Sequence, residues 1–406
     1  MFNENWVGLA VFAIVFGLIL RQSSLLALAI LVLVAAAAGW AWNKHSLRDI
    51  EYKRSFSERR AFLGETVDLT LQVTNRKLLP VSWLKIEDEY PLAITLLDGE
   101  VQPSTKQDVG LLGNLMSLRW FERTKWHYRL RCDKRGFYAF GPVHLQSGDL
   151  FGLFSSQANW QGLDWLIVYP EVKPMEVLTL PPKEPFGEVK AQQRIFEDPS
   201  RTIGIRDYQT EDTLRRIHWK ATARRQRLQV KVYEPTTSFQ LVIFLNMVTL
   251  PRHWQGTIPE LLERLVSVGA SIASYAVEKR FQVGLLANGC WPQSDQPLKV
   301  LPSRSPDQLM HILEALAAVS ALPTISIEDL LNRESARLPW GATLAVVTAV
   351  VSEELLVVMS RLQAAGRRIV LFRLDDEPLP LNVPKIVVHR VVDLDTAFGL
   401  EADNQR

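Results

Sequence analysis

The sequence predicts a fold of mixed class, α/β plus all-β, with an N-terminal transmembrane helical hairpin, a β-sandwich domain and a doubly wound α/β domain. Three patterns predict it: an apolar head, a region of period-2 alternation, and a region where strand and helix patterns alternate. The 406 residues fit two or three domains. The predicted boundaries are 1–43 for the hairpin, 44–170 for the sandwich, 171–237 for a linker with a basic block, 238–395 for the α/β domain and 396–406 for a tail.

The apolar head supplies the predicted hairpin. Of residues 1–42, 32 are apolar, and the run from Leu25 to Trp42 is interrupted only by Gly39. As a helix this run is roughly 27 Å long, close to the ~30 Å of a bilayer core. Residues 6–20 form a shorter run, so a single span or a re-entrant first segment is the alternative. A cleaved signal peptide fits less well, because no basic residue precedes the first run.

The distribution of basic residues predicts the orientation of this hairpin. Six Lys and Arg follow the second run closely, whereas the turn between the runs has only Arg21. We therefore expect a protein of the inner (cytoplasmic) membrane whose soluble domains lie in the cytoplasm. The two cysteines, Cys132 and Cys290, exclude a disulfide scaffold and agree with a reducing compartment. The six basic residues are Lys44, Arg48, Lys53, Arg54, Arg59 and Arg60.

The next two regions differ in their hydrophobic period. Short runs that alternate apolar and polar residues, separated by turn residues, predict a β-sandwich; they occupy 65–74, 81–87, 125–131 and 137–145. Further on, continuous apolar strands alternate with helical patterns, which predicts a mostly parallel sheet with helices on both faces. The strands are expected at 239–245, 281–286, 342–348 and 368–374, and the helices at 259–279, 307–319, 328–337 and 353–365.

A basic block lies between these regions, after a proline-rich stretch at 171–200 that we interpret as a linker. From Arg201 to Tyr233 there are nine Lys and Arg against three Asp and Glu, although the whole chain has a net charge of only +2. This block predicts a face that binds an anion or an acidic partner. The alternative is a solvated basic segment whose charges pair internally. Nucleic acid is an unlikely ligand, because Tyr208 and Trp219 alone do not make a stacking surface.

The same block resembles the signature of the domain of unknown function 58 family, over the run GIRDYQTEDTLRRIHWKATARRQRLQVKVYE. Residues 135–154 and 166–172 also fit that family, with Leu150 in place of a proline and Glu211 in place of a glycine. The residues on signature or interaction positions are Arg206, Tyr208, Asp212, Arg215, Ile217, Trp219, Lys220, Ala223, Arg224, Arg225, Arg227, Leu228, Val230 and Glu234.

The resemblance implies that the α/β domain is similar to von Willebrand factor A domains. Those domains bind a divalent metal through an Asp-x-Ser-x-Ser motif and a Thr and an Asp on later loops. Here Asn246, Val248 and Leu250 occupy the motif positions, and Thr348 is followed by alanine. Apolar side chains cannot coordinate Mg²⁺. We therefore expect a degenerate metal site near Asn246 and Thr348, and no bound cofactor.

The resemblance also implies a function, that of a membrane-anchored adaptor working with a MoxR-type AAA+ ATPase. A transglutaminase-like membrane protein is a second candidate partner. We expect no catalytic activity, because none of the common hydrolase, protease or nucleotide-binding motifs is present. Two alternatives stay open: a metal-dependent ligand binder of the von Willebrand factor A type, and an unrecognised hydrolase that uses His218 beside Asp212.

A third interpretation makes the signature block purely architectural. Trp219 and Tyr208 would then pack in the core, while Arg215 and Arg224 would pair with Asp212 or Glu234. We expect a mixture, in which the signature residues are structural and the additional arginines are exposed.

Overall fold

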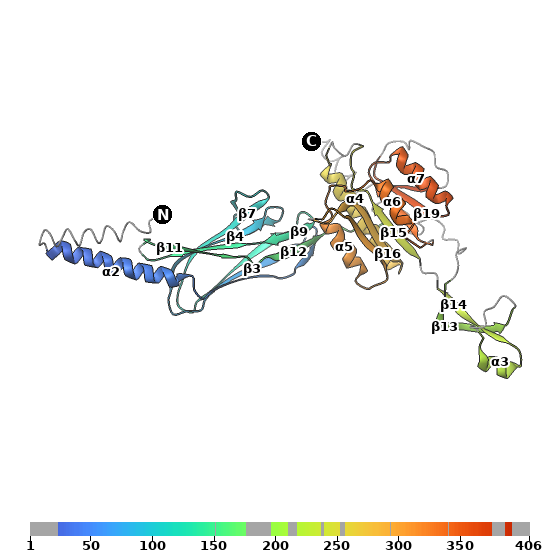
Figure 1. Ribbon diagram of the computed structural model, residues 1–406, viewed down its shortest axis with the longest axis horizontal. Coiled ribbons are helices and arrows are strands. Elements are labelled where there is room, and N and C mark those ends of the chain that lie inside the picture. Colours follow the sequence, from blue (N-terminus) through green and yellow to red (C-terminus); the bar gives the residue numbers. More distant parts are fainter. Residues whose placement is uncertain are drawn as a thin grey trace, which may run out of the picture. The chain divides into compact units, whose positions relative to one another are not determined.

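The computed structural model describes residues 23–150, 152–175, 196–209, 217–236, 239–251, 256–292, 294–339, 341–375 and 386–391. The chain divides into two compact units, unit 1 from Met1 to Pro170 and unit 2 from Glu171 to Arg406. Each unit is described by itself below (Figure 1).

Unit 1 consists of helix α2 (Ser23–Ser46) and three β-sheets. The sheets have the strand orders β1-β3-β8-β5, β11-β10-β4-β7-β6 and β2-β12-β9. Pairing is antiparallel except between β2 and β12. The strands are β1 (Ile50–Phe56), β2 (Arg60–Phe62), β3 (Thr66–Asn75), β4 (Val81–Pro91), β5 (Thr95–Leu96), β6 (Gln102–Pro103), β7 (Val109–Leu118), β8 (Arg123–Arg131), β9 (Gly136–Phe140), β10 (Val143–Gly148), β11 (Ser155–Trp160) and β12 (Asp164–Tyr169).

The core of unit 1 follows from alternation along its strands. In β3 every second side chain is buried, and these residues pack against buried aliphatic residues of β4 such as Leu84 and Ile86. The strand predictions at 65–74, 81–87 and 125–131 are confirmed by β3, β4 and β8. The run 137–145 is instead two strands in different sheets, because Gly141-Pro142 interrupts the ladder and Pro142 has no N–H to donate.

The predicted transmembrane hairpin, and with it the fold class as predicted, is wrong. The first apolar run, 6–20, lies outside the described residues, and the second lies in α2. Among the residues that the structure describes, no helix combines the length and the apolarity needed to cross a membrane. A span needs about 20 consecutive apolar residues, whereas α2 ends in the polar residues Asn43–Ser46, and its Gly39 lies against Asp149 and Phe154 in the turn between β10 and β11.

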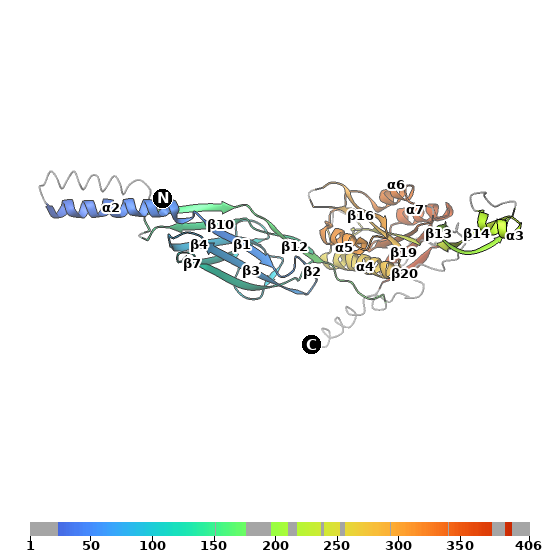
Figure 2. The same ribbon diagram turned by 90° about the horizontal axis from the view of Figure 1, so that it is seen from below.

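Unit 2 contains a six-stranded sheet of order β17-β16-β15-β18-β19-β20, parallel except for the edge strand β17. Helices α6 and α7 pack on the face that carries Val242 and Phe244, whereas Gly269 of α4 lies against Leu245 on the opposite face (Figures 1 and 2). The elements are β15 (Gln240–Leu245), α4 (Pro259–Glu278), β16 (Gln282–Cys290), β17 (Pro297–Ser303), α5 (Gln308–Ala318), α6 (Ile327–Ser335), β18 (Thr343–Thr348), α7 (Glu353–Ala364), β19 (Arg368–Arg373) and β20 (Val387–Arg390).

The strand and helix predictions for this sheet are confirmed, since each expected run coincides with an element. Its central strands β15 and β18 are buried along nearly their whole length because helices cover both faces of the sheet. The edge strands β17 and β20 were not expected. A separate hairpin, β13 (Phe196–Asp207) and β14 (Gln229–Thr236), with the short helix α3 (Trp219–Arg225) between its strands, holds the basic block. Its first strand begins within the stretch interpreted as a linker.

Candidate functional site

The basic block folds as a small segment of its own, built on strand β14. β14 pairs antiparallel with β13, so that Val230 lies opposite Arg206, and Ile217 forms an isolated bridge to the same Val230 from the other side. Ile217 and Val230 are both buried. The chain therefore brings three stretches of the basic block side by side around one buried valine.

Gln229 ties helix α3 to this hairpin. It is fully buried, and its side-chain amide donates a hydrogen bond to Asp207 Oδ1 on β13. The Gln229 backbone N–H donates to Thr222 Oγ1 at 3.0 Å, and its carbonyl accepts from the N–H of His218 at 2.8 Å. Buried polar groups need such partners. The two backbone contacts fix the start and the middle of α3 on β14, and the side-chain contact joins β14 to β13.

Helix α3 is held by its ends and by these contacts, and not by an apolar face. His218 caps its N-terminus, because Nδ1 accepts from the Ala221 N–H at 3.1 Å, and the helix stops at Gln226 in a left-handed conformation with φ of 54°. None of its residues is buried. A surface helix normally buries an apolar stripe, whereas in α3 only Ala221 and Thr222 are partly buried and the other residues are exposed. The cap also gives His218 a structural role.

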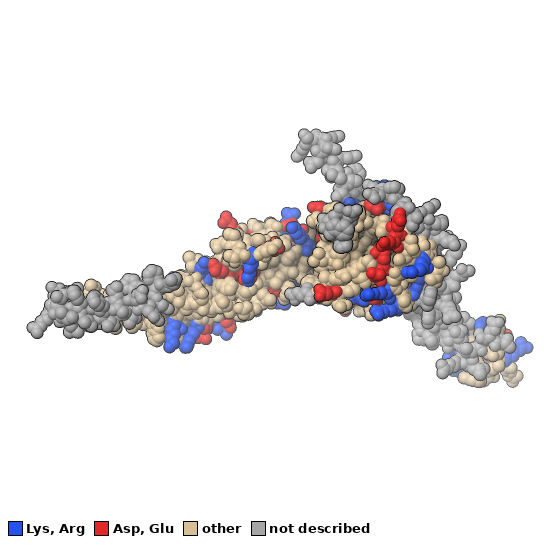
Figure 3. All heavy atoms as spheres, turned by 45° about the horizontal axis from the view of Figure 1, so that its top comes forward, with Lys and Arg blue, Asp and Glu red and all other residues tan. Residues whose placement is uncertain are grey.

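An exposed tryptophan is the main feature of α3. Trp219 is 69% exposed, and Ile205 and Leu228 are also exposed on the same segment. The prediction that Trp219 packs in the core is therefore wrong. Figure 3 shows basic side chains on the described part of this segment. We call the exposed set the Trp219 surface; it comprises Ile205, Arg206, Trp219, Lys220, Arg224, Arg225, Arg227 and Leu228.

The remaining signature residues are placed as follows. Tyr208 is half-buried, and its N–H donates to the Leu228 carbonyl at 3.0 Å. Glu234 lies in β14 opposite Asp198. Asp212 and Arg215 lie outside the described residues, as does the proposed pairing of Asp212 with His218.

The predicted degenerate metal site is brought together at the carboxyl ends of β15 and β18. Asn246 Nδ2 donates to Thr348 Oγ1 at 3.0 Å, and Thr348 Oγ1 donates to the Val350 carbonyl at 2.7 Å. A third residue, Asn288 of β16, donates through Nδ2 to Asn246 Oδ1 at 2.8 Å. The sequence analysis missed Asn288, although an asparagine at the end of an apolar strand was an available signal.

This network does not suit a metal ion. Asn246 Oδ1 also accepts from the Val248 N–H at 3.2 Å, and Asn288 Oδ1 accepts from the Met247 N–H at 2.7 Å. The oxygens that could ligate a cation are thus neutral and already accept hydrogen bonds, whereas hard cations are held mainly by carboxylates. No group of three or more His, Cys, Asp or Glu suited to a metal occurs within the described ranges. We interpret the network as a support for the strand ends.

A pocket of about 430 Å³ opens beside this network. The helix caps Ser326 and Ser352 lie at its edge, and Ser352 Oγ also donates to Glu328 Oε1 at 2.7 Å. The carboxylates of Glu328 and Glu354 line the pocket. They stand in the first turns of α6 and α7, where they counter the positive ends of both helix dipoles.

Comparison with known proteins finds a relative in sequence and partial likenesses among solved structures. The uncharacterized protein YeaD of Bacillus subtilis is 24% identical over 318 residues, which cover 77% of this chain and 73% of that protein. Among solved structures, the sporulation control protein Spo0M from Bacillus subtilis matches 33% of this chain and 54% of its own, with 13% identity and a TM-score of 0.20. A β-glucosidase from Listeria innocua matches 29% of this chain and 16% of its own, with 10% identity and a TM-score of 0.18. Neither structural likeness supports an inference.

The family comparison agrees with the resemblance seen in the signature block. The family described as "Protein of unknown function DUF58" matches residues 204–405. This range holds the end of β13, all of α3 and β14, and the whole six-stranded sheet. Through these residues, the chain belongs to the DUF58 family.

Proposed function

We propose that the protein is an interaction adaptor that docks a partner protein through the Trp219 surface and has no catalytic activity of its own. The observation that carries the proposal is helix α3, which buries no residue and in which Trp219 is 69% exposed. Tryptophan and arginine are enriched among the residues that dominate binding energy at protein interfaces. Trp219 is flanked by Lys220 on the helix, with Arg224 and Arg225 one turn further on.

The proposed partner has an acidic surface with an apolar recess for the Trp219 ring. Lys220, Arg224, Arg225 and Arg227 would steer such a partner and make charge-assisted hydrogen bonds with it. The family resemblance implies a MoxR-type AAA+ ATPase, which is our candidate. A transglutaminase-like protein is the second candidate. The cytoplasmic location inferred from the charge pattern stays a prediction.

The test measures binding of the purified full chain to a purified MoxR-type ATPase from the same organism. Trp219→Ala should weaken binding at least tenfold, as expected for a hot-spot residue. Trp165→Ala is the matched control, because Trp165 is an exposed tryptophan of unit 1 outside the Trp219 surface. An Arg225→Glu, Arg227→Glu variant should bind more weakly and lose most of the salt dependence of binding.

Folding of the variants separates an interaction role from an architectural one. Because α3 buries no residue, Trp219→Ala should change the free energy of unfolding by only about 0.5 kcal/mol. A loss of several kcal/mol would instead make Trp219 a packing residue. Unchanged affinity of both variants for the ATPase would overturn the proposed docking surface.

A further inference from the structure

Unit 1 presents a second group of exposed apolar side chains, at two adjoining loop tips. Leu78 is 76% exposed in the loop between β3 and β4, and Trp120 and Phe121 are 63% and 62% exposed in the loop between β7 and β8. The two loops touch, since the Phe121 N–H donates to the Lys77 carbonyl at 3.3 Å. We call Leu78, Trp120 and Phe121 the loop patch.

The loop patch is held in place by a buried asparagine. Asn75 Nδ2 donates to the carbonyls of Leu79 and Arg119 at 3.0 and 2.9 Å, one in each loop. The Asn75 N–H donates to the Glu122 carbonyl at 2.9 Å. Phe121 has φ of 52°, a backbone conformation that is rare for an aromatic residue. The backbone therefore fixes both aromatic rings on the outside of the unit.

Basic side chains surround the loop patch. Lys77 Nζ donates to the Ser46 carbonyl at 2.7 Å, and the Arg76 N–H donates to the Asp49 carbonyl at 2.9 Å, so the end of α2 borders the loops. Figure 3 shows basic side chains gathered on unit 1 beside this end of α2. Over 43–51, 76–79 and 119–123 there are six basic and three acidic residues: Lys44, Arg48, Arg76, Lys77, Arg119 and Arg123 against Asp49, Glu51 and Glu122.

We propose that the loop patch docks on an anionic phospholipid surface. Trp120 and Phe121 would enter the interfacial layer, where aromatic rings are favoured, while Arg119 and Arg123 would contact headgroup phosphates. Charge complementarity favours anionic phospholipid as the ligand. The exposed apolar side chains of the loop patch match the acyl-chain layer of a bilayer, and the surrounding basic residues match its anionic headgroups. The proposed contact is peripheral and is made by the two loops. It is also independent of the Trp219 surface, which belongs to the other unit.

The first experiment measures binding of the full chain to vesicles of phosphatidylcholine alone and of phosphatidylcholine with 30% phosphatidylglycerol. Wild type should bind the anionic vesicles more tightly, and an Arg119→Glu, Arg123→Glu variant should lose about tenfold or more of that affinity, since each basic residue near the surface contributes several-fold. Leu92→Ser is the control, because Leu92 is exposed beyond the opposite end of β4. Equal affinity of wild type for the two vesicles would overturn the proposal.

The second experiment tests whether the loop patch itself contacts the lipid, and it does so even if another part of the chain also binds vesicles. Lipids brominated near the top of their acyl chains should quench part of the tryptophan fluorescence of wild type. That part should be absent in Trp120→Phe, which keeps an aromatic ring, and should persist in Trp165→Phe. Circular dichroism should show all variants folded. Identical quenching of wild type and Trp120→Phe would exclude the loop patch as the lipid contact and leave an acidic protein surface as the occupant to examine.

Discussion

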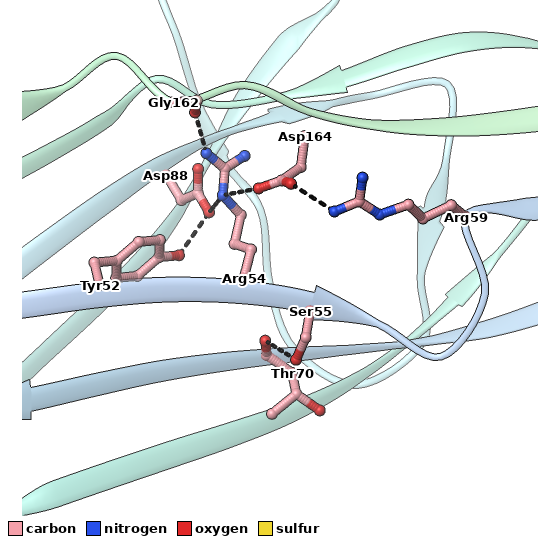
Figure 4. A network of polar contacts seen from close by, with 8 residues as sticks. All are labelled: Tyr52, Arg54, Ser55, Arg59, Thr70, Asp88, Gly162 and Asp164. Atoms are coloured by element: carbon pink, nitrogen blue, oxygen red, sulfur yellow. Dashed lines mark hydrogen bonds and ion pairs between the residues drawn. The ribbon is translucent and has the colours of Figure 1, made fainter.

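Unit 1 contains a polar network around Arg54 that includes Tyr52, Asp88 and Asp164. Arg54 Nε lies 3.6 Å from Asp88 Oδ2 and 3.6 Å from Asp164 Oδ2, with the Arg54 side chain fully buried (Figure 4). Tyr52 donates to Asp88 Oδ2 at 2.6 Å, and burial raises the pKa of the Tyr52 hydroxyl, so this group stays protonated as the donor. The two carboxylates offset part of the free-energy cost of removing the Arg54 guanidinium from water.

Gly141 also lies beside this guanidinium. A Cβ at Gly141 would lie 2.5 Å from Arg54 Nη2 and 2.7 Å from the carbonyl oxygen of Gly162, and Gly141 has φ of 99°. Only glycine fits both the conformation and the space. Sequence reasoning saw a strand through this position because Phe137–Leu145 is apolar on alternate residues. It could not foresee that Arg54, distant in sequence, occupies the space beside the strand.

Asp88 should make the stability of unit 1 depend on pH. Burial is the largest cause that raises its pKa, to about 6, while Arg54 and the Tyr52 hydrogen bond act in the opposite direction. From pH ~4, the usual aspartate pKa, to ~6, folded Asp88 keeps a proton that the unfolded chain releases. Its contribution to the free energy of unfolding should therefore fall as pH rises through this window, by up to about 3 kcal/mol.

The measurement compares wild type with Asp88→Asn by hydrogen exchange of β1 and β4 at pH 4 to 7. After correction for the intrinsic exchange rate, the stability of wild type relative to the variant should decline with rising pH. A difference that is constant, or that grows with pH, would show that Asp88 is ionised in the folded unit over this range, as its ion pair with Arg54 alone would require.

At the scale of elements, the packing of α2 against the turn between β10 and β11 depends on one glycine, Gly39. A Cβ at Gly39 would lie 3.0 Å from Asp149 Oδ2 and 3.5 Å from the ring of Phe154. Asp149 has little freedom to move, because Oδ1 accepts from the Phe154 N–H at 2.7 Å. The hydrophobic pattern identified a helix here but gave no indication that it packs on the β10–β11 turn, since that contact depends on the absence of a side chain.

Gly39→Val should therefore destabilise unit 1 by about 1–3 kcal/mol through overpacking. Ala37→Val is the matched control, because Ala37 is exposed on the same helix and receives the same β-branched side chain. Thermal unfolding of the full chain, with hydrogen exchange of β10 and β11, gives the comparison. Similar losses in the two variants would mean that α2 does not depend on close contact with Asp149.

Trp219 illustrates at the same scale what hydrophobicity alone cannot decide. A large aromatic residue in a signature motif is usually a core residue, and the sequence analysis placed it there. Its position is decided by Gln229, which holds α3 against β14 by hydrogen bonds to the start and middle of the helix and leaves its sides uncovered. Asn288 was missed for a related reason, because its partner Asn246 lies on another strand.

For the whole molecule, hydrophobic periodicity was sufficient to predict both β regions, because the pattern of apolar residues along a strand reflects whether one or both of its faces are buried. Strands of unit 1 such as β3 alternate apolar and polar residues, since one face of each sheet is buried, whereas β15 and β18 have continuous apolar runs at their centres. Very short strands such as β5 and β6 carry too few residues for a period. The hydropathy of the second apolar run identified a helix but gave no information about the contact of Gly39 with Asp149 and Phe154.

Each unit has its own hydrophobic core, which predicts that they respond separately to core mutations. The core of unit 1 draws on residues between Tyr52 and Val168, and a core of unit 2 draws on residues between Val242 and Ile386. Leu71→Ala should destabilise unit 1 by about 2–5 kcal/mol through the cavity it leaves, and Leu344→Ala should act equally on unit 2. Both leucines are fully buried.

Hydrogen exchange resolves the two responses, because a chain with two cores has no single free energy of unfolding. Leu71→Ala should lower protection in β1, β3 and β8 and leave β15, β18 and β19 as in wild type, while Leu344→Ala should do the reverse. Affinity for a partner at the Trp219 surface should stay within twofold of wild type in Leu71→Ala. Loss of protection in both units from either substitution would show that the cores unfold as one, and the proposed division of labour between a lipid-docking unit and a partner-docking unit would then lose its structural basis.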